Sequence, residues 1–482
     1  MKQSVESRLR RHCLSFVELL AQNIALISPT MTAALIVPLM YSNTGAMSWL
    51  SYAVGTVMLL FVALNLNQFA KRSSGTGSMY SYTSVGLGPS AGCIAGWCLI
   101  WAYLFIGLAG TTGFTIFATK ILAAMGMTIP PIILFAVCLA ACFVLAYLDI
   151  KVSTVVSLVL EAISVSLILI LCLIVLGRHH FAIDATQFSF SGFSWMNLGL
   201  GVVVAVFSLV GFESSTAFGE EAKDATKTVP RSIIWSLIMT GAFFVVVCYT
   251  EVLATNGYTT TLDKIDAPLS VMADLSKVSF LSLPLAFGAM ASFFALALSC
   301  MNAGSRVLLA MGRHEIVHSV TSKTHAKHET PHVALGVMAI LMFVIVTASR
   351  IFFKFEVLDE FNDAGTMGAF GFIGAYVLVT LAAPFYLKKR SELKTIDVVW
   401  CVAGLALLMI PAIGSVYPVP PAPVNYFPYI FLIYLLIGIV RVFALNVQAP
   451  ERIKEIRDKI HSLHAPDLLA PDASLSESSV RT

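Results

Sequence analysis

The chain has 482 residues, of which 58% are hydrophobic and 12% are charged, and its mean hydropathy is +0.85. Soluble domains hold about 25% charged and about 45 to 50% apolar residues, so this composition excludes a soluble globular protein and indicates an integral membrane protein. The formal net charge is only +3, and no nucleic-acid partner is expected.

Long apolar runs follow one another along the whole chain. A helix needs about 20 mostly apolar residues to cross the hydrocarbon core of a bilayer. Twelve runs of this kind are centred near residues 28, 58, 105, 140, 165, 207, 243, 295, 341, 372, 406 and 434. These runs are continuous, whereas the strands of a membrane barrel alternate in polarity over about ten residues. We therefore predict an all-α integral membrane protein with twelve transmembrane helices and no soluble domain.

The positive charges between the runs predict the topology. With Arg306 and Arg441 assigned to helices, 22 of the 30 Lys and Arg residues fall in segments that are cytoplasmic if the N-terminus is, and 6 fall in outer segments. Positive residues favour the cytoplasmic side, so both termini are expected in the cytoplasm of a multi-pass cell-membrane protein. We expect a cytoplasmic segment over 1–15, a transmembrane domain over 16–446 and, because little in it can be buried, a disordered tail over 447–482. The first run lacks a cleavage site and is expected to be a retained helix.

The cysteines and histidines predict no metal site or cofactor. Most of the nine cysteines lie inside predicted helices, where they read as small apolar fillers. Five of the ten histidines fall in the loop over 313–332, but their spacing matches no standard ligand set. We interpret that loop as a solvated hairpin.

Helix-forming sequence is visibly disrupted inside two of the runs. They are ALISPTMTAALIVP, residues 25–38, and FSLVGFESST, residues 207–216. Pro29 removes a backbone donor in the first, while in the second Gly211 weakens the helix and the hydroxyl groups of 214–216 compete for backbone groups. Each helix is predicted to open there. Two ordinary kinked helices are the alternative, since Pro and Gly are common in membrane helices.

Open backbone inside a bilayer requires a protein or water-filled environment, because each unsatisfied amide costs several kcal/mol. Breaks at matching positions in helices 1 and 6 point to an inverted repeat with a solute site near the bilayer midplane. Helix N-termini at such breaks attract carboxylate, and free carbonyl groups attract ammonium or metal cations. A small zwitterion satisfies both requirements.

At these residues the sequence resembles the amino acid, polyamine and organocation permeases. GFESSTAFGEEAKDATKTVPRSI, residues 211–233, is similar to the sixth helix and following loop of that superfamily. SCMNAGSRVLLAMGRHEIVHS, residues 299–319, followed by TPHVAL, residues 330–335, is similar to its eighth helix and the hairpin beyond. The resemblance extends from about residue 15 to 445. One departure is that Thr30 to Ala33 stand where the superfamily usually has a Gly-Ser-Gly type segment.

The resemblance implies a LeuT-like fold of two inverted five-helix repeats with discontinuous helices 1 and 6. The first repeat would cover 16–178 and the second 194–387, and two extra C-terminal helices would lie in 397–446.

It also implies a substrate site at the two breaks. The candidate substrate-binding residues are Ile27, Ser28, Thr30, Met31, Thr32, Ala33, Phe207, Ser208, Val210 and Gly211. Backbone and hydroxyl groups from Ser28 to Ala33 would hold a carboxylate, and the freed carbonyl groups of residues 27, 207, 208 and 210 would receive an α-ammonium group. Phe207 matches a gating ring, although an aromatic residue in a membrane helix more often serves packing.

Two carboxyl groups in apolar helices are the candidates for coupling and gating. An acidic residue at mid-helix costs roughly 2.5 to 3.5 kcal/mol even on lenient insertion scales. Glu161 matches the place of an ionisable side chain in proton-coupled relatives, and desolvation opposes its charged form. It is alternatively a structural partner of Arg306 or of a Ser or Asn on helix 8, such as Ser299 or Asn302. We include Ser299 and Asn302 among the coupling candidates. A sodium site made of helix 1 carbonyls and helix 8 hydroxyls is the third reading.

Glu213 lies at the second break. The resemblance favours a gating or proton-sensing role, and capping of the freed amides is the structural alternative.

The sequence thus predicts a secondary active transporter that moves an amino acid or related amine by alternating access, as a proton-coupled symporter. A sodium-coupled symporter or an exchanger of the same fold is the alternative. An enzyme is disfavoured because no catalytic motif is visible, and a channel because no filter-like repeat is visible. The expected partners are the small-molecule substrate, protons or sodium, and the lipid bilayer.

Overall fold

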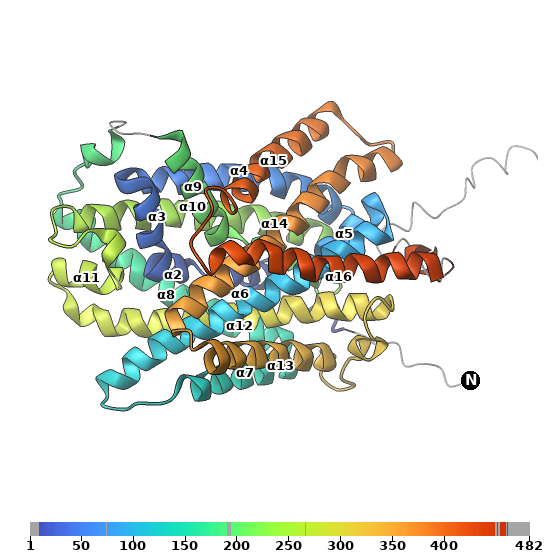
Figure 1. The fold of residues 1–482 in the computed structure, drawn as a ribbon, viewed down its shortest axis with the longest axis horizontal. Coiled ribbons are helices and arrows are strands. Elements are labelled where there is room, and N and C mark those ends of the chain that lie inside the picture. The colour runs from blue at the N-terminus through green and yellow to red at the C-terminus, as the bar shows by residue number, and fades with distance from the viewer. Residues whose placement is uncertain are drawn as a thin grey trace, which may run out of the picture.

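The computed structural model describes residues 9–73, 75–189, 194–265 and 267–448, together with 451, 454–458 and 460. Within these residues the chain is helical, and its one β pairing is an isolated parallel bridge between Leu14 and Ala222 (Figure 1). The predicted all-α class is confirmed.

The helices follow the apolar runs. They are α1 (Phe16–Ile27), α2 (Pro29–Met31), α3 (Val37–Thr44), α4 (Ser48–Ala70), α5 (Ser78–Leu87), α6 (Pro89–Ala124), α7 (Pro131–Leu148), α8 (Ile150–Arg178), α9 (Trp195–Leu209), α10 (Ala225–Thr255), α11 (Pro268–Leu275), α12 (Ser282–Arg313), α13 (His332–Ala348), α14 (Val357–Lys389), α15 (Thr395–Gly414) and α16 (Phe427–Gln448).

Eleven helical stretches of the described chain are long and apolar enough to cross a membrane. The first, Phe16–Ala70, has 55 residues, whereas one crossing needs about 20. Gly45, with φ 58°, divides this stretch between α3 and α4. It therefore contains two of the predicted apolar runs and has the length for two crossings.

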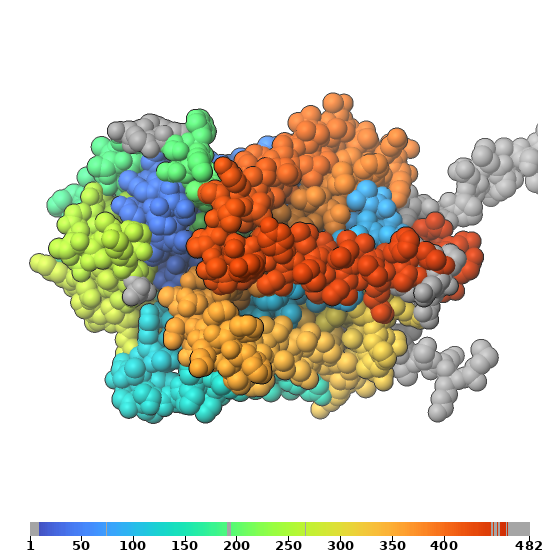
Figure 2. All heavy atoms as spheres, viewed as in Figure 1, coloured from blue at the N-terminus to red at the C-terminus, as the bar shows by residue number. Residues whose placement is uncertain are grey.

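Helix α6 lies at the centre of the bundle. It packs along both α12 and α14, and 78% of its most apolar stretch is buried. The corresponding share for Val424–Ala444, which includes most of α16, is 22%. In Figure 2 the atoms of α16 accordingly cover the middle of one face. The exposed apolar side chains of such peripheral helices are those expected to meet lipid.

The first membrane helix is interrupted after α1. Ser28 has the left-handed φ of 51°, and Pro29 begins the next short helix at its first position, where a missing backbone donor costs nothing. A π-helical turn, Thr32–Ile36, then joins α2 to α3. Left-handed backbone and a π-helical turn are both departures from a regular helix.

The sixth predicted helix is interrupted after α9. Val210 is extended, Gly211 has φ 98°, and a 3-10 segment, Ser214–Phe218, follows. A φ of this value is accessible mainly to glycine. Both predicted interruptions are therefore present.

The two interruptions lie against each other. A Cβ atom added to Gly211 would be 2.0 Å from Cδ2 of Leu26. Asn23 Oδ1 accepts hydrogen bonds from the Ser215 backbone N–H at 2.7 Å and the Ser214 hydroxyl at 3.0 Å. The Asn23 side chain thus satisfies a donor that the second interruption frees.

The start of the C-terminal tail differs from the prediction. Residues 454–458 are helical, and Ile456 is only 4% exposed. Ile456 gives this part of the tail an apolar side chain to bury. The prediction rested on the Pro, Ser and Asp content of the whole tail and did not consider this side chain. Residues 461–482 lie outside the described residues.

Candidate functional site

The candidate substrate-binding residues all lie at the two helix breaks. Ser28, Thr32, Ala33 and Ser208 are 0% exposed, and the side chains of the other candidates on the first break are at most 2% exposed. The Thr30 and Thr32 hydroxyl groups have no hydrogen-bond partner within the described chain. Buried hydroxyl groups without partners are unusual and are available to a ligand.

Phe207 is partly buried at the end of α9 and packs against α14. A Cβ atom added to Gly365 would lie 2.3 Å from its Cζ atom, so the ring occupies the space that a side chain at residue 365 would need. Helix α14 therefore limits the positions that Phe207 can adopt.

Glu161 connects α8 to the first break through two hydroxyl groups. Its Oε1 atom accepts a hydrogen bond from Ser292 of α12 at 2.9 Å, and the Ser292 and Ser28 hydroxyl oxygens are 3.0 Å apart. The Thr30 backbone N–H also approaches the carboxyl group. Its Oε2 atom has no partner within the described chain, and the side chain is 3% exposed. A change of charge on Glu161 would therefore alter the hydrogen bonding of Ser292 and Ser28 at the first break.

The other predicted partners of Glu161 lie elsewhere. Asn302 donates to Ser153 at 2.6 Å, and the Ser299 carbonyl accepts from Gln22 at 3.0 Å. Arg306 binds Glu221. The partner of Glu161 on this helix is therefore a serine, as the structural alternative allowed, but it is Ser292 and not Ser299, Asn302 or Arg306. Its coupling role and its structural role both stay predictions.

Glu213 is held by tyrosine side chains from two other helices. Tyr376 of α14 donates to Oε2 at 2.6 Å, and Tyr103 of α6 donates to Oε1 at 3.3 Å. The Tyr376 hydroxyl oxygen in turn accepts the freed backbone N–H of Gly211 at 3.3 Å. Glu213 and Tyr376 together hold the second break to the central helices.

A buried ion pair closes the bundle at the end that carries the N-terminal segment. Arg306 donates to both carboxyl oxygens of Glu221, at 2.5 and 2.7 Å, and both side chains are 0% exposed. The guanidinium group also lies 4.5 Å above the Phe218 ring. A second pair, Arg313 with Glu220 at 2.8 Å, is partly exposed.

Residues 12–14 lie directly over this pair. The backbone N–H groups of Cys13 and Leu14 donate to the Glu221 carbonyl at 2.8 and 2.9 Å, and Lys223 N–H donates to the Leu14 carbonyl at 2.7 Å. Arg10 also binds Asp149 between α7 and α8. These contacts join the N-terminal segment to two loops at the same end of the bundle.

We expect Gly211→Ala to reduce the free energy of unfolding by about 1 to 3 kcal/mol, because alanine is strained at φ 98° and its Cβ would strike Leu26. Thermal unfolding of the purified protein measures the loss. Gly257→Ala is the matched control, since Gly257 has φ 79° but nothing within 4 Å of its added Cβ. Equal losses in the two variants would mean that contact with Leu26 contributes nothing.

Sequence reasoning missed Ser292, Tyr103 and Tyr376. Each is an ordinary residue in a membrane helix, and nothing local distinguishes Ser292 from the other serines of α12. A tyrosine hydroxyl buried in an apolar helix is a polar group that needs a partner, and this signal could have indicated Tyr103 and Tyr376. Within the described residues, no three His, Cys, Asp or Glu side chains are grouped so that they could hold a metal ion.

Comparison with known proteins identifies several relatives. The chain is 26% identical over 426 residues to the branched-chain amino acid permease BcaP of Bacillus subtilis (strain 168), covering 82% of this chain and 84% of that protein. It is 28% identical over 377 residues to BcaP of Lactococcus lactis subsp. cremoris (strain MG1363), covering 70% and 77%. The low-affinity putrescine importer PlaP of Escherichia coli (strain K12) is 23% identical over 351 residues, with 71% and 74% covered.

A solved structure shows the same fold. It is a Na⁺-coupled sialic acid symporter in a substrate-bound, outward-open state, which matches with a TM-score of 0.52 and 12% identity over 84% of this chain and 90% of that one. The family model described as amino acid permease matches residues 14–443. The chain therefore belongs to the amino acid permease family, within the amino acid, polyamine and organocation superfamily.

Proposed function

We propose that this protein is a secondary active transporter that moves an amino acid or related amine across the cell membrane by alternating access, as a proton-coupled symporter. The observation that carries the proposal is the connection from Glu161 through Ser292 to Ser28 at the first break. It places a buried group that can carry a proton beside the proposed carboxylate-binding backbone.

The proposed substrate is a neutral amino acid. Two relatives are named for branched-chain amino acids and one for putrescine. Both oxygens of Glu213 accept tyrosine hydroxyls, so this carboxylate is already engaged and offers little to a second ammonium group of the substrate. This arrangement favours a neutral side chain over a polyamine.

Sodium coupling is the second candidate. The oxygen atoms of Glu161, Ser292 and Ser28 form a short chain of hard ligands, and oxygen ligands suit a hard cation. A sodium ion there would take the place of the proton on Glu161.

Uptake into proteoliposomes tests the coupling. With a pH gradient, acidic outside, and no sodium, we expect accumulation of a neutral amino acid above its equilibrium level. With a sodium gradient at uniform pH, we expect none. The reverse result would establish the sodium candidate. Uptake that needs no gradient, but requires amino acid inside the vesicles, would establish an exchanger.

Alternating access predicts that Cys13 becomes reactive when the cytoplasmic side opens. Burial, and secondarily the nearby Glu221 carboxylate, raise the pKa of this thiol from 9.0 to about 11. The thiolate is the reactive form, so about a hundredfold less of it is present at neutral pH than for the unperturbed thiol. We expect maleimide labelling of Cys13 to accelerate during substrate-driven turnover.

The labelling is measured on the full chain in nanodiscs, with Cys13→Ser giving the background from the eight other cysteines. A Cys13 labelling rate that is the same with and without substrate would contradict movement of the N-terminal segment.

A further inference from the structure

We propose that a cavity between α6, α13, α14 and α16 binds an amphipathic amine, with an apolar body of drug-like size and one protonated amino group that pairs with Glu360. The cavity lies outside the two helix breaks and is independent of the proposed transport function. Its volume is about 520 Å³, within the usual range of about 300 to 1,000 Å³ for small-molecule sites.

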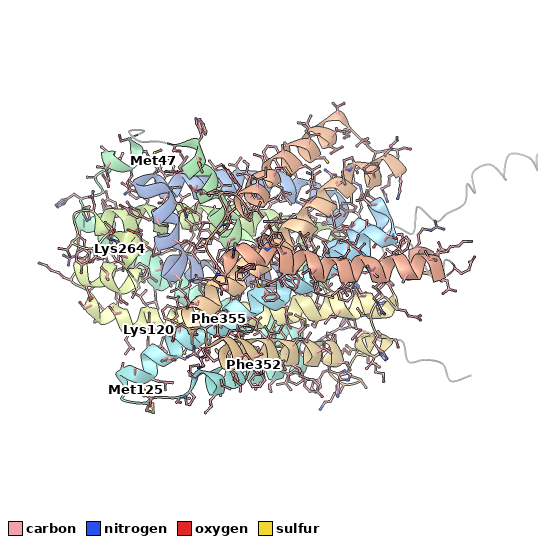
Figure 3. The ribbon with its side chains drawn as sticks, in the orientation of Figure 1. Met47, Lys120, Met125, Lys264, Phe352 and Phe355 are labelled. Carbon is pink, nitrogen blue, oxygen red and sulfur yellow. The ribbon has the colours of Figure 1, made fainter. Side chains whose placement is uncertain are left out.

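The walls of the cavity are almost entirely apolar. Phe105 and Leu108 of α6, Val344 of α13, Met367 of α14 and Ile430 of α16 are among the lining residues. Val344 and Ile430 are 54% and 44% exposed, so the cavity opens on the apolar side of the bundle. Figure 3 shows Phe355, another lining residue, in the loop between α13 and α14. An occupant must therefore be mostly apolar and able to arrive through the lipid.

One end of this apolar cavity holds an acidic side chain with an unused acceptor. Glu360 lines the cavity and is only 5% exposed. Its Oε1 atom accepts from the Ser349 hydroxyl at 2.8 Å, whereas Oε2 has no hydrogen-bond partner within the described chain. Burying a carboxylate oxygen without a hydrogen-bond partner is energetically unfavourable, and a positively charged donor offsets this cost best.

The carboxyl groups that line the cavity favour a ligand that is positively charged and carries no phosphate group. Asp363 also lines the cavity one turn along α14 and places a second carboxyl group beside Glu360. Arg350 is a cation close to Glu360, but it donates to the Phe355 carbonyl and lies 3.8 Å from Glu356. A lipid phosphate would be repelled by the two lining carboxylates, while a primary amine would be attracted.

An occupant would touch α14 on a different side from the proposed gate. Ala364 and Met367 line the cavity, whereas Gly365 between them packs against Phe207. Residues 364 and 367 are i and i+3 on one helical face, and residue 365 is turned away from them.

The test uses the full chain in phosphatidylcholine nanodiscs and a dodecylamine probe with a diazirine in its chain. After illumination, mass spectrometry maps the modified residues. We expect labelling to concentrate on cavity residues of α6, α13 and α16, and unlabelled dodecylamine, but not dodecanol, to compete. Labelling spread evenly over the lipid-facing surface, or equal competition by dodecanol, would overturn the proposal.

Two variants and one control test whether Glu360 binds the amino group of the probe. Glu360→Gln should lower cavity labelling by about tenfold or more, since a hydrogen bond to a charged group is lost. It retains an acceptor for Ser349, so the fold should persist, and its thermal unfolding checks this. Ile430→Trp, which fills the exposed mouth, should also lower labelling. Glu356→Gln changes a side chain that is 80% exposed and should label like the unmodified protein. Unchanged labelling in Glu360→Gln would refute the pairing.

Discussion

Glu161→Gln is expected to abolish amino acid accumulation driven by a pH gradient while leaving exchange across the same proteoliposomes largely intact. Glutamine keeps the size of the side chain and can still accept the Ser292 hydroxyl, which is now 2.9 Å from Oε1. It cannot gain or lose a proton. The helix breaks would therefore still bind substrate, but substrate movement would no longer be tied to a proton.

The measurement compares gradient-driven uptake with counterflow of labelled substrate in the same preparation. Glu251→Gln is the matched control, because Glu251 of α10 is likewise buried, at 0% exposed against 3% for Glu161, and has neither carboxyl oxygen hydrogen-bonded within the described chain. It should retain coupled uptake. If Glu161→Gln loses both activities in parallel, Glu161 has a structural role and the coupling assignment fails.

Arg306→Ala is expected to reduce the free energy of unfolding by about 3 to 5 kcal/mol, because it leaves the Glu221 carboxylate buried and without its cation. Both side chains are 0% exposed, so the Glu221 carboxylate that remains is shielded from bulk water. Thermal unfolding of the purified protein, in detergent and in nanodiscs, measures the loss.

Two comparisons isolate the ion pair. Arg313→Ala breaks the partly exposed pair with Glu220 and should cost no more than about 1 kcal/mol. The double variant Arg306→Leu with Glu221→Leu removes both charges and should recover a large part of the stability lost in Arg306→Ala. A double variant as unstable as Arg306→Ala would show that the loss comes from packing against Phe218 and not from the unpaired charge.

Composition and the position of Pro and Gly were sufficient to predict the membrane fold and both helix breaks. Pro29 lacks a backbone N–H donor, and Gly211 can adopt a positive φ. Both effects are local, so they can be predicted from the sequence. The proposed site residues follow from these breaks and from the resemblance, and their roles remain predictions.

The hydrogen-bond partners were not predictable in the same way. Ser292 is 131 residues from Glu161, and Tyr376 is 163 residues from Glu213. Such pairs depend on the rotation and axial position of whole helices, which apolar periodicity does not define to within one residue. Asn302 and Ser299 were plausible partners for Glu161 because they lie on the correct helix, but Asn302 donates to Ser153, and Ser292 of the same helix is the residue that reaches Glu161.

The pairing of residues 12–14 with residues 220–223 has a mechanical consequence. Residues 12–14, just before α1, are joined to residues 220–223 by main-chain hydrogen bonds, and Asn23 within α1 accepts hydrogen bonds from Ser214 and Ser215. Because two sets of hydrogen bonds join α1 and its preceding residues to residues 214–223, we expect these two segments to move together as one rigid body. Ser28 and Gly211, where the backbone leaves the regular helix, would be the two hinges of such a movement.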